Sequence, residues 1–442
     1  MLNISLNLNL VFNQKYLYII YVTIAFFLNR SLYGLNPSEA FQEIRLANQE
    51  LSNHYLIHEF FGYIGTFIIS IILNIYQKYI FKRNLRENVL NARIQLIYNS
   101  PSQNINIFHS SKKVILIFFL TLFFAVFEEQ IIDLYLNIFQ DLDFWMIELF
   151  LFSYFNALMY NKIVIYAHQK FAILLSIFPI LFKIMSIILS FNDNTNDKDN
   201  YTGSLPIYYK TKSFFKIPIG ILIYLLFISL RSCVNLTLKW IMDYKFISHI
   251  EVLAFYSLIG TVFYLITIVV ITNIKCKEII NGYNNIDYCD YLAKIKENIT
   301  TNTIYYFENY KIYWSNIKKF QTIREIIIII AQIIVLFIKK YFSLLILKDL
   351  SPSELIFTVP LSYLLQKIVS ITLSLIMDNR WILTENKYKK TKIIFDGFGD
   401  IFSIIGLLIY LEIIELKFCK LDEDLKKNIA NRAPLVDEEN EN

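Results

Sequence analysis

The chain has 442 residues, of which 56% are hydrophobic and 18% are charged, and its formal net charge at pH 7 is +5. Its apolar residues fall in blocks separated by short polar stretches, which is typical of a membrane protein and excludes an ordinary soluble enzyme. The basic residues lie between these blocks and form no footprint for a nucleic acid.

Ten of the apolar blocks approach the length of a membrane-spanning helix. A hydrocarbon core of roughly 30 Å requires about 20 apolar residues, because each backbone N–H and C=O must be bonded within its own segment. We therefore predict an all-α fold, a polytopic membrane helical bundle of about ten transmembrane helices. In chain order the blocks lie at 15–29, 57–80, 114–137, 145–165, 170–190, 217–240, 250–273, 323–347, 353–377 and 395–416.

A polar insert near the midpoint divides the ten blocks into two halves of five. The first half is 1–190, the insert is 191–216, and the second half is 217–416 with a polar loop at 276–320. Residues 417–442 are strongly charged, and we expect them to form a solvated cytosolic tail.

The first block, 15–29, has two interpretations. It is short enough to be the apolar region of a signal peptide, but no basic region precedes it and no small-residue cleavage site follows. We favour a retained helix.

The distribution of basic residues predicts the orientation of the bundle. The connections at 78–113, 162–170 and 239–245 are basic, so we place them in the cytosol, together with both termini if the number of spans is even. Asn200 and Asn298 begin glycosylation sequons in loops that we place outside the cytosol. Several lysines near Asn298 favour the opposite side, but long loops follow the charge rule poorly.

Two short stretches carry a resemblance to a known family. Tyr160–Phe171 joins the fourth and fifth blocks through a short basic turn, and Asp349–Pro352 followed by Val359–Tyr363 opens the ninth block with prolines. With ten spans, a midpoint insert and cytosolic termini, the chain resembles nucleotide-sugar-transporter-like members of the drug/metabolite transporter superfamily. The resemblance implies two inverted five-helix repeats, a substrate site between them at the membrane midplane, and alternating access.

A few ionisable residues lie deep within the apolar blocks. A charge in hydrocarbon costs several kcal/mol, so such residues are functional candidates. Arg231, Lys340 and Lys367 belong to different blocks but lie between the midplane and the cytosolic side, where they could converge on an anion such as a phosphorylated or carboxylated metabolite. Tyr363 and Gln366 lie within one helical turn of Lys367 and could add hydrogen bonds.

Each candidate also has a structural interpretation. Lys183, Lys339 and Lys340 could snorkel to the interface, and Gln332 and Asn156 could form interhelical hydrogen bonds instead of contacting substrate. Arg231 and Lys367 could pair with a carboxylate of the bundle, for which the candidates are Glu128, Glu129, Asp133 and Glu325.

Glu128 and Glu129 are neighbours in the sequence and therefore point about 100° apart on a helix. At most one of them can face a given cavity squarely. A carboxylate in such a position could couple transport to protons, whereas a position at the lumenal interface would explain both residues without any role in transport.

The histidines and cysteines give no metal or cofactor motif. His54 and His58 would share a helix face, but two ligands do not make a site. We expect His168 to be an interfacial residue of a tight turn. Cys276 and Cys289 share one polar loop and could form a single disulfide if that loop faces an oxidising compartment.

These features predict a secondary transporter of a small organic solute, for which a nucleotide-sugar or another anionic metabolite is one candidate class. We expect no enzymatic activity, no cofactor and no nucleic-acid partner, with lipid and a small-molecule substrate as the partners. The alternatives are a membrane-embedded acyltransferase-type enzyme, which would need an exposed catalytic histidine with a carboxylate beside it, and a non-transporting scaffold or receptor. The expected location is an endomembrane or the plasma membrane.

Overall fold

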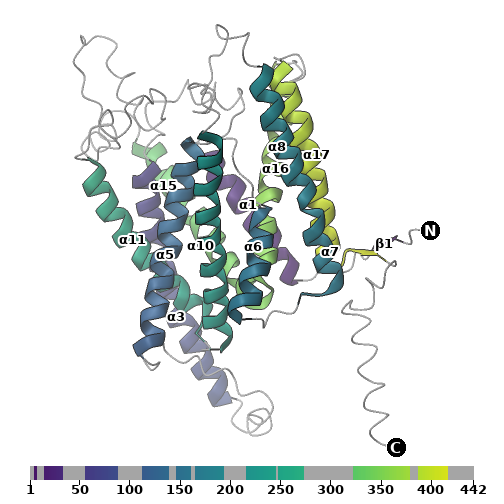
Figure 1. Ribbon diagram of the computed structural model, residues 1–442. Coiled ribbons are helices and arrows are strands. Elements are labelled where there is room, and N and C mark those ends of the chain that lie inside the picture. Colours follow the sequence, from purple (N-terminus) through teal and green to yellow (C-terminus); the bar gives the residue numbers. More distant parts are fainter. Residues whose placement is uncertain are drawn as a thin grey trace, which may run out of the picture.

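The computed structural model describes residues 4–6, 14–32, 55–87, 112–138, 146–160, 165–193, 216–244, 247–272, 322–378 and 387–416. Within these ranges the chain is almost entirely helical, and its long helices run side by side as a bundle (Figure 1). This confirms the predicted all-α class.

Helices lie at each of the ten predicted blocks. They are α1 (Gln14–Leu32), α3 (Tyr55–Glu87), α5 (Lys112–Ile138), α6 (Ile147–Phe155) with the π-helical turn η3 (Asn156–Tyr160), α7 (Ala167–Leu175) and α8 (Ile177–Asp193), α10 (Lys216–Tyr244), α11 (His249–Thr272), α15 (Thr322–Asp349), α16 (Pro352–Asp378) and α17 (Lys387–Tyr410).

Five segments within the described residues are long and apolar enough to cross a membrane. They are Leu56–Gln77, Ala167–Ser186, Pro218–Asp243, His249–Val270 and Ile329–Asp349. Leu17–Leu28, Ile147–Leu158 and Gly397–Tyr410 are apolar but shorter. These lengths fit an integral membrane protein, whereas the full set of ten crossings in two inverted halves stays a prediction.

The fifth block contains a break that its apolar character does not reveal. Helix α7 ends at Leu175 and α8 begins at Ile177, with the Ser176 hydroxyl donating to the carbonyl of Ile173 at 2.5 Å. Pro179 explains the break, because a proline has no N–H to donate and its ring crowds the carbonyl four residues earlier, which here is that of Leu175.

The two ends of the described chain lie together. Strand β1 (Ile4–Leu6) pairs antiparallel with β2 (Ile414–Leu416), so that Ser5 lies opposite Glu415. Because β2 follows the end of α17, the pairing brings the start of the chain to the same end of the bundle. This arrangement fits the even number of crossings that cytosolic termini require.

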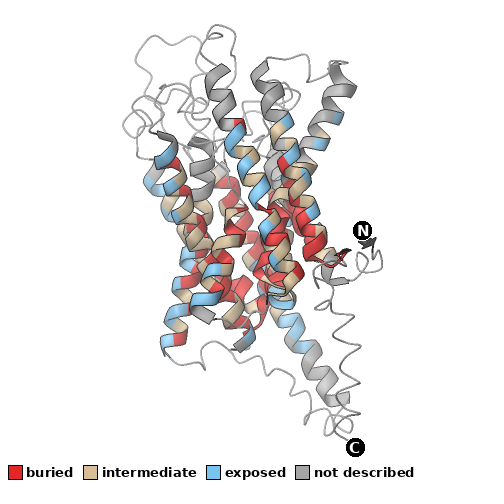
Figure 2. Ribbon diagram, turned by 45° about the vertical axis from the view of Figure 1, so that its right-hand side comes forward, coloured by how far each residue is buried: buried red, intermediate tan, exposed pale blue. Residues whose placement is uncertain are grey.

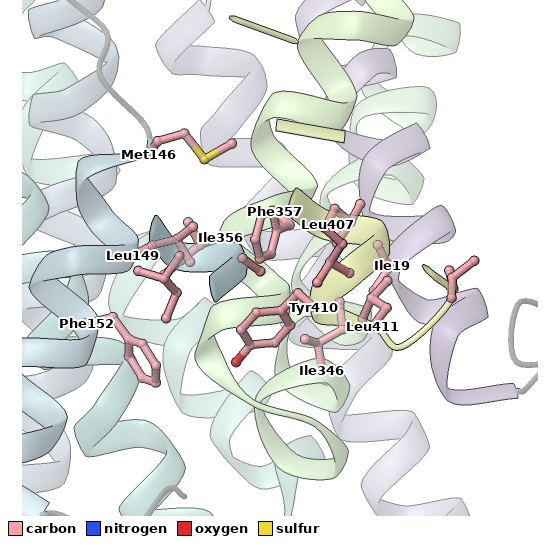
Figure 3. Close-up of a cluster of buried hydrophobic side chains, with 14 of the residues drawn as sticks. Ile19, Met146, Leu149, Phe152, Ile346, Ile356, Phe357, Leu407, Tyr410 and Leu411 are labelled. Atoms are coloured by element: carbon pink, nitrogen blue, oxygen red, sulfur yellow. The ribbon is translucent and has the colours of Figure 1, made fainter. Parts of the chain in front are cut away.

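Two buried hydrophobic clusters hold the bundle together. Figure 3 shows one of them, in which Ile19 of α1, Phe152 of α6, Ile346 of α15, Phe357 of α16 and Leu407 of α17 meet. The other cluster joins α3, α5, α10, α11 and α15. Helix α15 contributes to both clusters.

The outward faces of several helices are also apolar (Figure 2). Large exposed side chains include Ile72 and Ile75 on α3, Leu116 on α5, Ile266 on α11 and Ile327 on α15. Exposure of this much apolar surface to water would be unfavourable, whereas lipid would cover it. The interior of the bundle holds most of the buried residues.

Candidate functional site

The charged interior of the bundle is organised around two neighbouring residues of α5. Glu128 and Glu129 lie near the middle of this helix and bind different partners, as the angle of about 100° between consecutive helical side chains requires. Two acid–base centres therefore lie on either side of α5, and we name each after its carboxylate.

The Glu128 centre joins three helices. Arg231, near the middle of α10, places Nε 2.7 Å from Glu128 Oε1 and Nη1 3.8 Å from Glu148 Oε2 of α6. Figure 1 shows α6 and α5 on either side of α10, and both pack against it. The guanidinium group of Arg231 thus contacts two buried carboxylates, those of Glu128 and Glu148.

The Glu129 centre joins α5 to α15. The ammonium group of Lys339 lies 2.7 Å from Glu129 Oε1, and that of Lys340 bonds to Oε2. Lys339 also lies over the ring of Phe26 of α1, with Nζ 4.6 Å from the ring centre. Both ammonium groups are therefore held inside the bundle.

Two tyrosines complete the Glu129 centre. The hydroxyl of Tyr256 on α11 donates to Glu129 Oε2 at 2.8 Å, and that of Tyr63 on α3 donates to the same oxygen at 3.1 Å. Lys340 donates in turn to the Tyr256 hydroxyl at 2.7 Å. Hydrogen bonds that involve charged groups are stronger than neutral ones, so this set fixes α3, α5, α11 and α15 relative to one another.

Glycines let the helices around the Glu129 centre approach closely. A Cβ atom at Gly260 of α11 would overlap the ring of Tyr63, and one at Gly65 of α3 would lie 2.5 Å from the side chain of Ile333. Close contact at small residues is how membrane helices pack. Gly260 in particular leaves the space in which the Tyr63 ring lies.

The predicted substrate-binding residues separate into two groups. Arg231 and Lys340 bind consecutive carboxylates of α5, one in each centre, and their convergence on one substrate cavity stays a prediction. Gln332 of α15 is buried and donates to Glu59 of α3 at 2.8 Å. Lys367, Tyr363 and Gln366 belong to α16, but their side chains lie outside the part of the chain that the structure describes.

One structural interpretation of the sequence is wrong. Lys339 and Lys340 do not snorkel, because both ammonium groups bind Glu129 in the interior. The side chain of Glu128 is buried against Arg231, and its expected position at the lumenal interface stays a prediction. The pairing of Arg231 with Glu128 is one of the alternatives that the sequence left open.

The sequence did not single out Glu59 and Glu148. Each lies within the first turns of its helix, where a carboxylate is ordinarily a solvated end residue. Both are buried in the structure. The sequence did contain one sign of their burial, because a long run of apolar residues begins directly after each of them.

His168 has a carboxylate neighbour that is distant in sequence. Its Nε2 lies 3.4 Å from Glu412 Oε1, and its ring stacks on Tyr166. His168 is only 2% exposed and lies in the first turn of α7, and its expected position at the membrane interface stays a prediction. An acyltransferase-type enzyme would need such a pair to be accessible.

Glu412 occupies a position that normally favours glycine. Its φ is 62°, in the left-handed region. The amide of Ile413 donates to Leu408 and that of Glu412 to Ile409, which is the Schellman arrangement at the C-terminus of a helix. The Glu412 carboxylate contacts His168 at 3.4 Å, and this contact could offset part of the cost of the left-handed backbone.

Among the described residues, no group of three or more metal-ligating side chains is present. Several predicted features lie outside these residues: Cys276, Cys289, both sequons, His54, and the side chains of Asp133 and Glu325. No protein-family model matches the chain, and no curated protein matches it either.

Proposed function

We propose that the chain is a multi-pass membrane transporter that moves a small organic solute by alternating access. In this proposal the ten helical segments form two five-helix halves, as in the drug/metabolite transporter superfamily. One observation carries the proposal: both acid–base centres join a helix of the first half to a helix of the second. Glu128 of α5 pairs with Arg231 of α10, and Glu129 of α5 pairs with Lys339 and Lys340 of α15.

Charges at the boundary between two halves suit a transporter. Buried ionisable residues are costly in a membrane, and those that persist commonly mark a substrate or ion pathway. When the halves rock, each base can exchange its carboxylate for a solute and then return to it. An anionic metabolite would take the place of Glu128 or Glu129 as the partner of a base.

The test begins with a search for the solute. The purified protein is screened for thermal stabilisation by nucleotide-sugars, sugar phosphates, carboxylates and neutral metabolites, because a compound that binds only the folded state raises its apparent stability. Stabilising compounds are then tested for uptake into proteoliposomes. We expect at least one compound to stabilise the protein and to enter only liposomes that contain it.

Variants connect that uptake to the site. Lys340→Gln and Lys367→Ala should reduce uptake strongly, whereas Lys170→Gln, at an exposed position of α7, should leave it unchanged. Melting temperatures measured in parallel separate loss of transport from loss of folding. Failure of every compound to stabilise the protein and to enter the liposomes would reject the transport proposal.

The enzyme alternative has one feature in its favour, the contact between His168 and Glu412. Burial of both side chains argues against it, because a catalytic histidine must reach its substrate. The transporter proposal accounts for the larger set of buried charges.

A further inference from the structure

Glu148 is a buried carboxylate of the described chain with one oxygen that lacks a hydrogen-bond partner. It is the second residue of α6 and is 1% exposed. One of its oxygens lies 3.8 Å from Arg231 Nη1, and the other, Oε1, has no hydrogen-bond partner among the described residues. An ionised oxygen in that position would be desolvated without compensation.

The nearest base is already engaged. Arg231 holds Glu128 with its Nε at 2.7 Å, so the second carboxylate receives only the longer contact. Lys339 and Lys340 are bonded to Glu129, on the other side of α5. Two acids therefore share one guanidinium, and the more distant acid lacks a full partner.

The other elements packed against α6 supply no second base to Glu148 within the described side chains. Helix α10 contributes the phenol of Tyr224, two turns before Arg231, and α16 contributes Glu354, which accepts hydrogen bonds from Ser351 and Ser353. Tyr154 of α6 itself is exposed. Lys367 of α16 has its side chain outside the described part, and a Lys367→Gln variant shows whether its ammonium group pairs with Glu148.

We propose that Glu148 carries a proton in the state described, and that the Glu128–Arg231–Glu148 group is a proton-binding site of the bundle. Protonation removes the uncompensated charge at Oε1 and leaves Arg231 paired with Glu128. If Arg231 moves closer to Glu148 while staying in contact with Glu128, Glu148 can release its proton to water, and when Arg231 returns, Glu148 takes up a proton again. Movement of one guanidinium between two acids thus links conformational change to proton binding and release.

The first experiment measures the proton without requiring any solute. Infrared spectra of the purified protein at neutral pH should contain the carbonyl stretch of a protonated carboxyl group, with the expected shift in D₂O. Glu148→Gln should remove this band and keep the protein folded, because glutamine has the shape of the protonated acid. Glu354→Gln, at a carboxyl group that accepts serine hydrogen bonds, should leave the band in place.

A wild-type spectrum without the band would overturn this assignment, and so would a band that survives Glu148→Gln. If the band is absent from the wild type and appears in Lys367→Gln, the ammonium group of Lys367 is the missing partner of Glu148. A wild-type band that disappears on adding sodium ions at constant pH would identify a sodium site instead and would also overturn it.

The second experiment rests on the proposed function and tests coupling. In proteoliposomes with an imposed pH gradient, wild-type protein should accumulate its solute, and Glu148→Gln should lose the gradient-driven accumulation while retaining exchange of solute across the membrane. Unchanged gradient-driven accumulation by Glu148→Gln would overturn the coupling role. If no solute is transported at all, the proposed function fails, and the infrared band still decides whether Glu148 is protonated.

Discussion

At the scale of single residues, Glu128 and Glu129 bind bases that are far from them in the sequence. Glu129 and Lys339 are separated by 210 positions, yet their charged atoms lie 2.7 Å apart. Removal of one member of such a buried pair leaves an uncompensated charge and typically costs about 3–5 kcal/mol. These pairs therefore constrain how the helices can be arranged.

The sequence indicated which charged residues lie within apolar helices but not the direction in which they point. The position of Arg231 in the middle of its apolar block made a buried partner necessary, and Glu128 was among the candidates. Lys339 and Lys340 lie toward one end of their block, which favoured snorkelling. Which way each lysine turns depends on the rotation of α15 against α5, and a single sequence does not contain that information.

The contact between His168 and Glu412 gives a residue-scale prediction. Glu412→Gly relieves the left-handed backbone conformation, which costs a residue with a side chain about 1 kcal/mol. It also removes the contact with His168. We expect Glu412→Gly to stabilise the protein more in a His168→Ala background, where that contact is already lost, than in the wild type.

Thermal unfolding of the four proteins in detergent measures this double-mutant cycle. Equal effects of Glu412→Gly in the two backgrounds would mean that His168 and Glu412 do not stabilise each other. The unusual residue at the end of α17 would then need another explanation.

At the scale of helices, the apolar blocks predicted where helices occur but not how each is interrupted. All ten blocks contain helix, because apolar segments of this length satisfy their backbone groups internally. The break between α7 and α8 follows from Pro179, and the short α6 passes into a π-helical turn at the buried Asn156. Both are local changes of backbone conformation, and the mean hydropathy of a whole apolar block does not reveal them.

Close packing of α3 against α11 gives an element-scale prediction. The chain has only 10 glycines, and the absence of a side chain at Gly260 leaves the room that the Tyr63 ring occupies. Gly260→Ala should displace the Tyr63 ring, weaken its hydrogen bond to Glu129 and destabilise the protein by about 1–3 kcal/mol, the usual cost of overpacking.

Gly397→Ala in α17 is the matched control, because a Cβ atom there meets nothing within 4 Å. It should leave stability unchanged or raise it slightly, since alanine is the better helix former. Unfolding measured by circular dichroism compares the two variants. Equal stability of Gly260→Ala and Gly397→Ala would show that α3 and α11 do not approach as closely as the structure indicates.

At the scale of the whole molecule, the pairing of β1 with β2 joins the beginning of the chain to its end. The predicted cytosolic position of both termini requires them to lie on one side of the membrane, and the strand register brings Ser5 opposite Glu415. The distribution of basic residues among the loops predicted that both termini lie on the cytosolic side. The strands themselves are too short to give a sequence signal.

Engineered cysteines test this arrangement. In a background with the native cysteines replaced by serine, Ser5→Cys combined with Glu415→Cys should form a disulfide on mild oxidation, because opposed positions of antiparallel strands lie within disulfide range. Ser5→Cys with Gly397→Cys is the control, since Gly397 lies roughly 20 Å along α17 from the end of that helix. Gel mobility reports the cross-link, and equal cross-linking of both pairs would contradict the register.

The account as a whole depends on the helices lying in a lipid bilayer. Membranes from cells that express the chain can be washed with alkaline carbonate, which releases peripheral proteins and retains proteins that span the bilayer. Because the outward faces of α3, α5, α11 and α15 are apolar, we predict that the chain stays in the membrane pellet. Recovery of the folded chain in the carbonate supernatant would contradict the account.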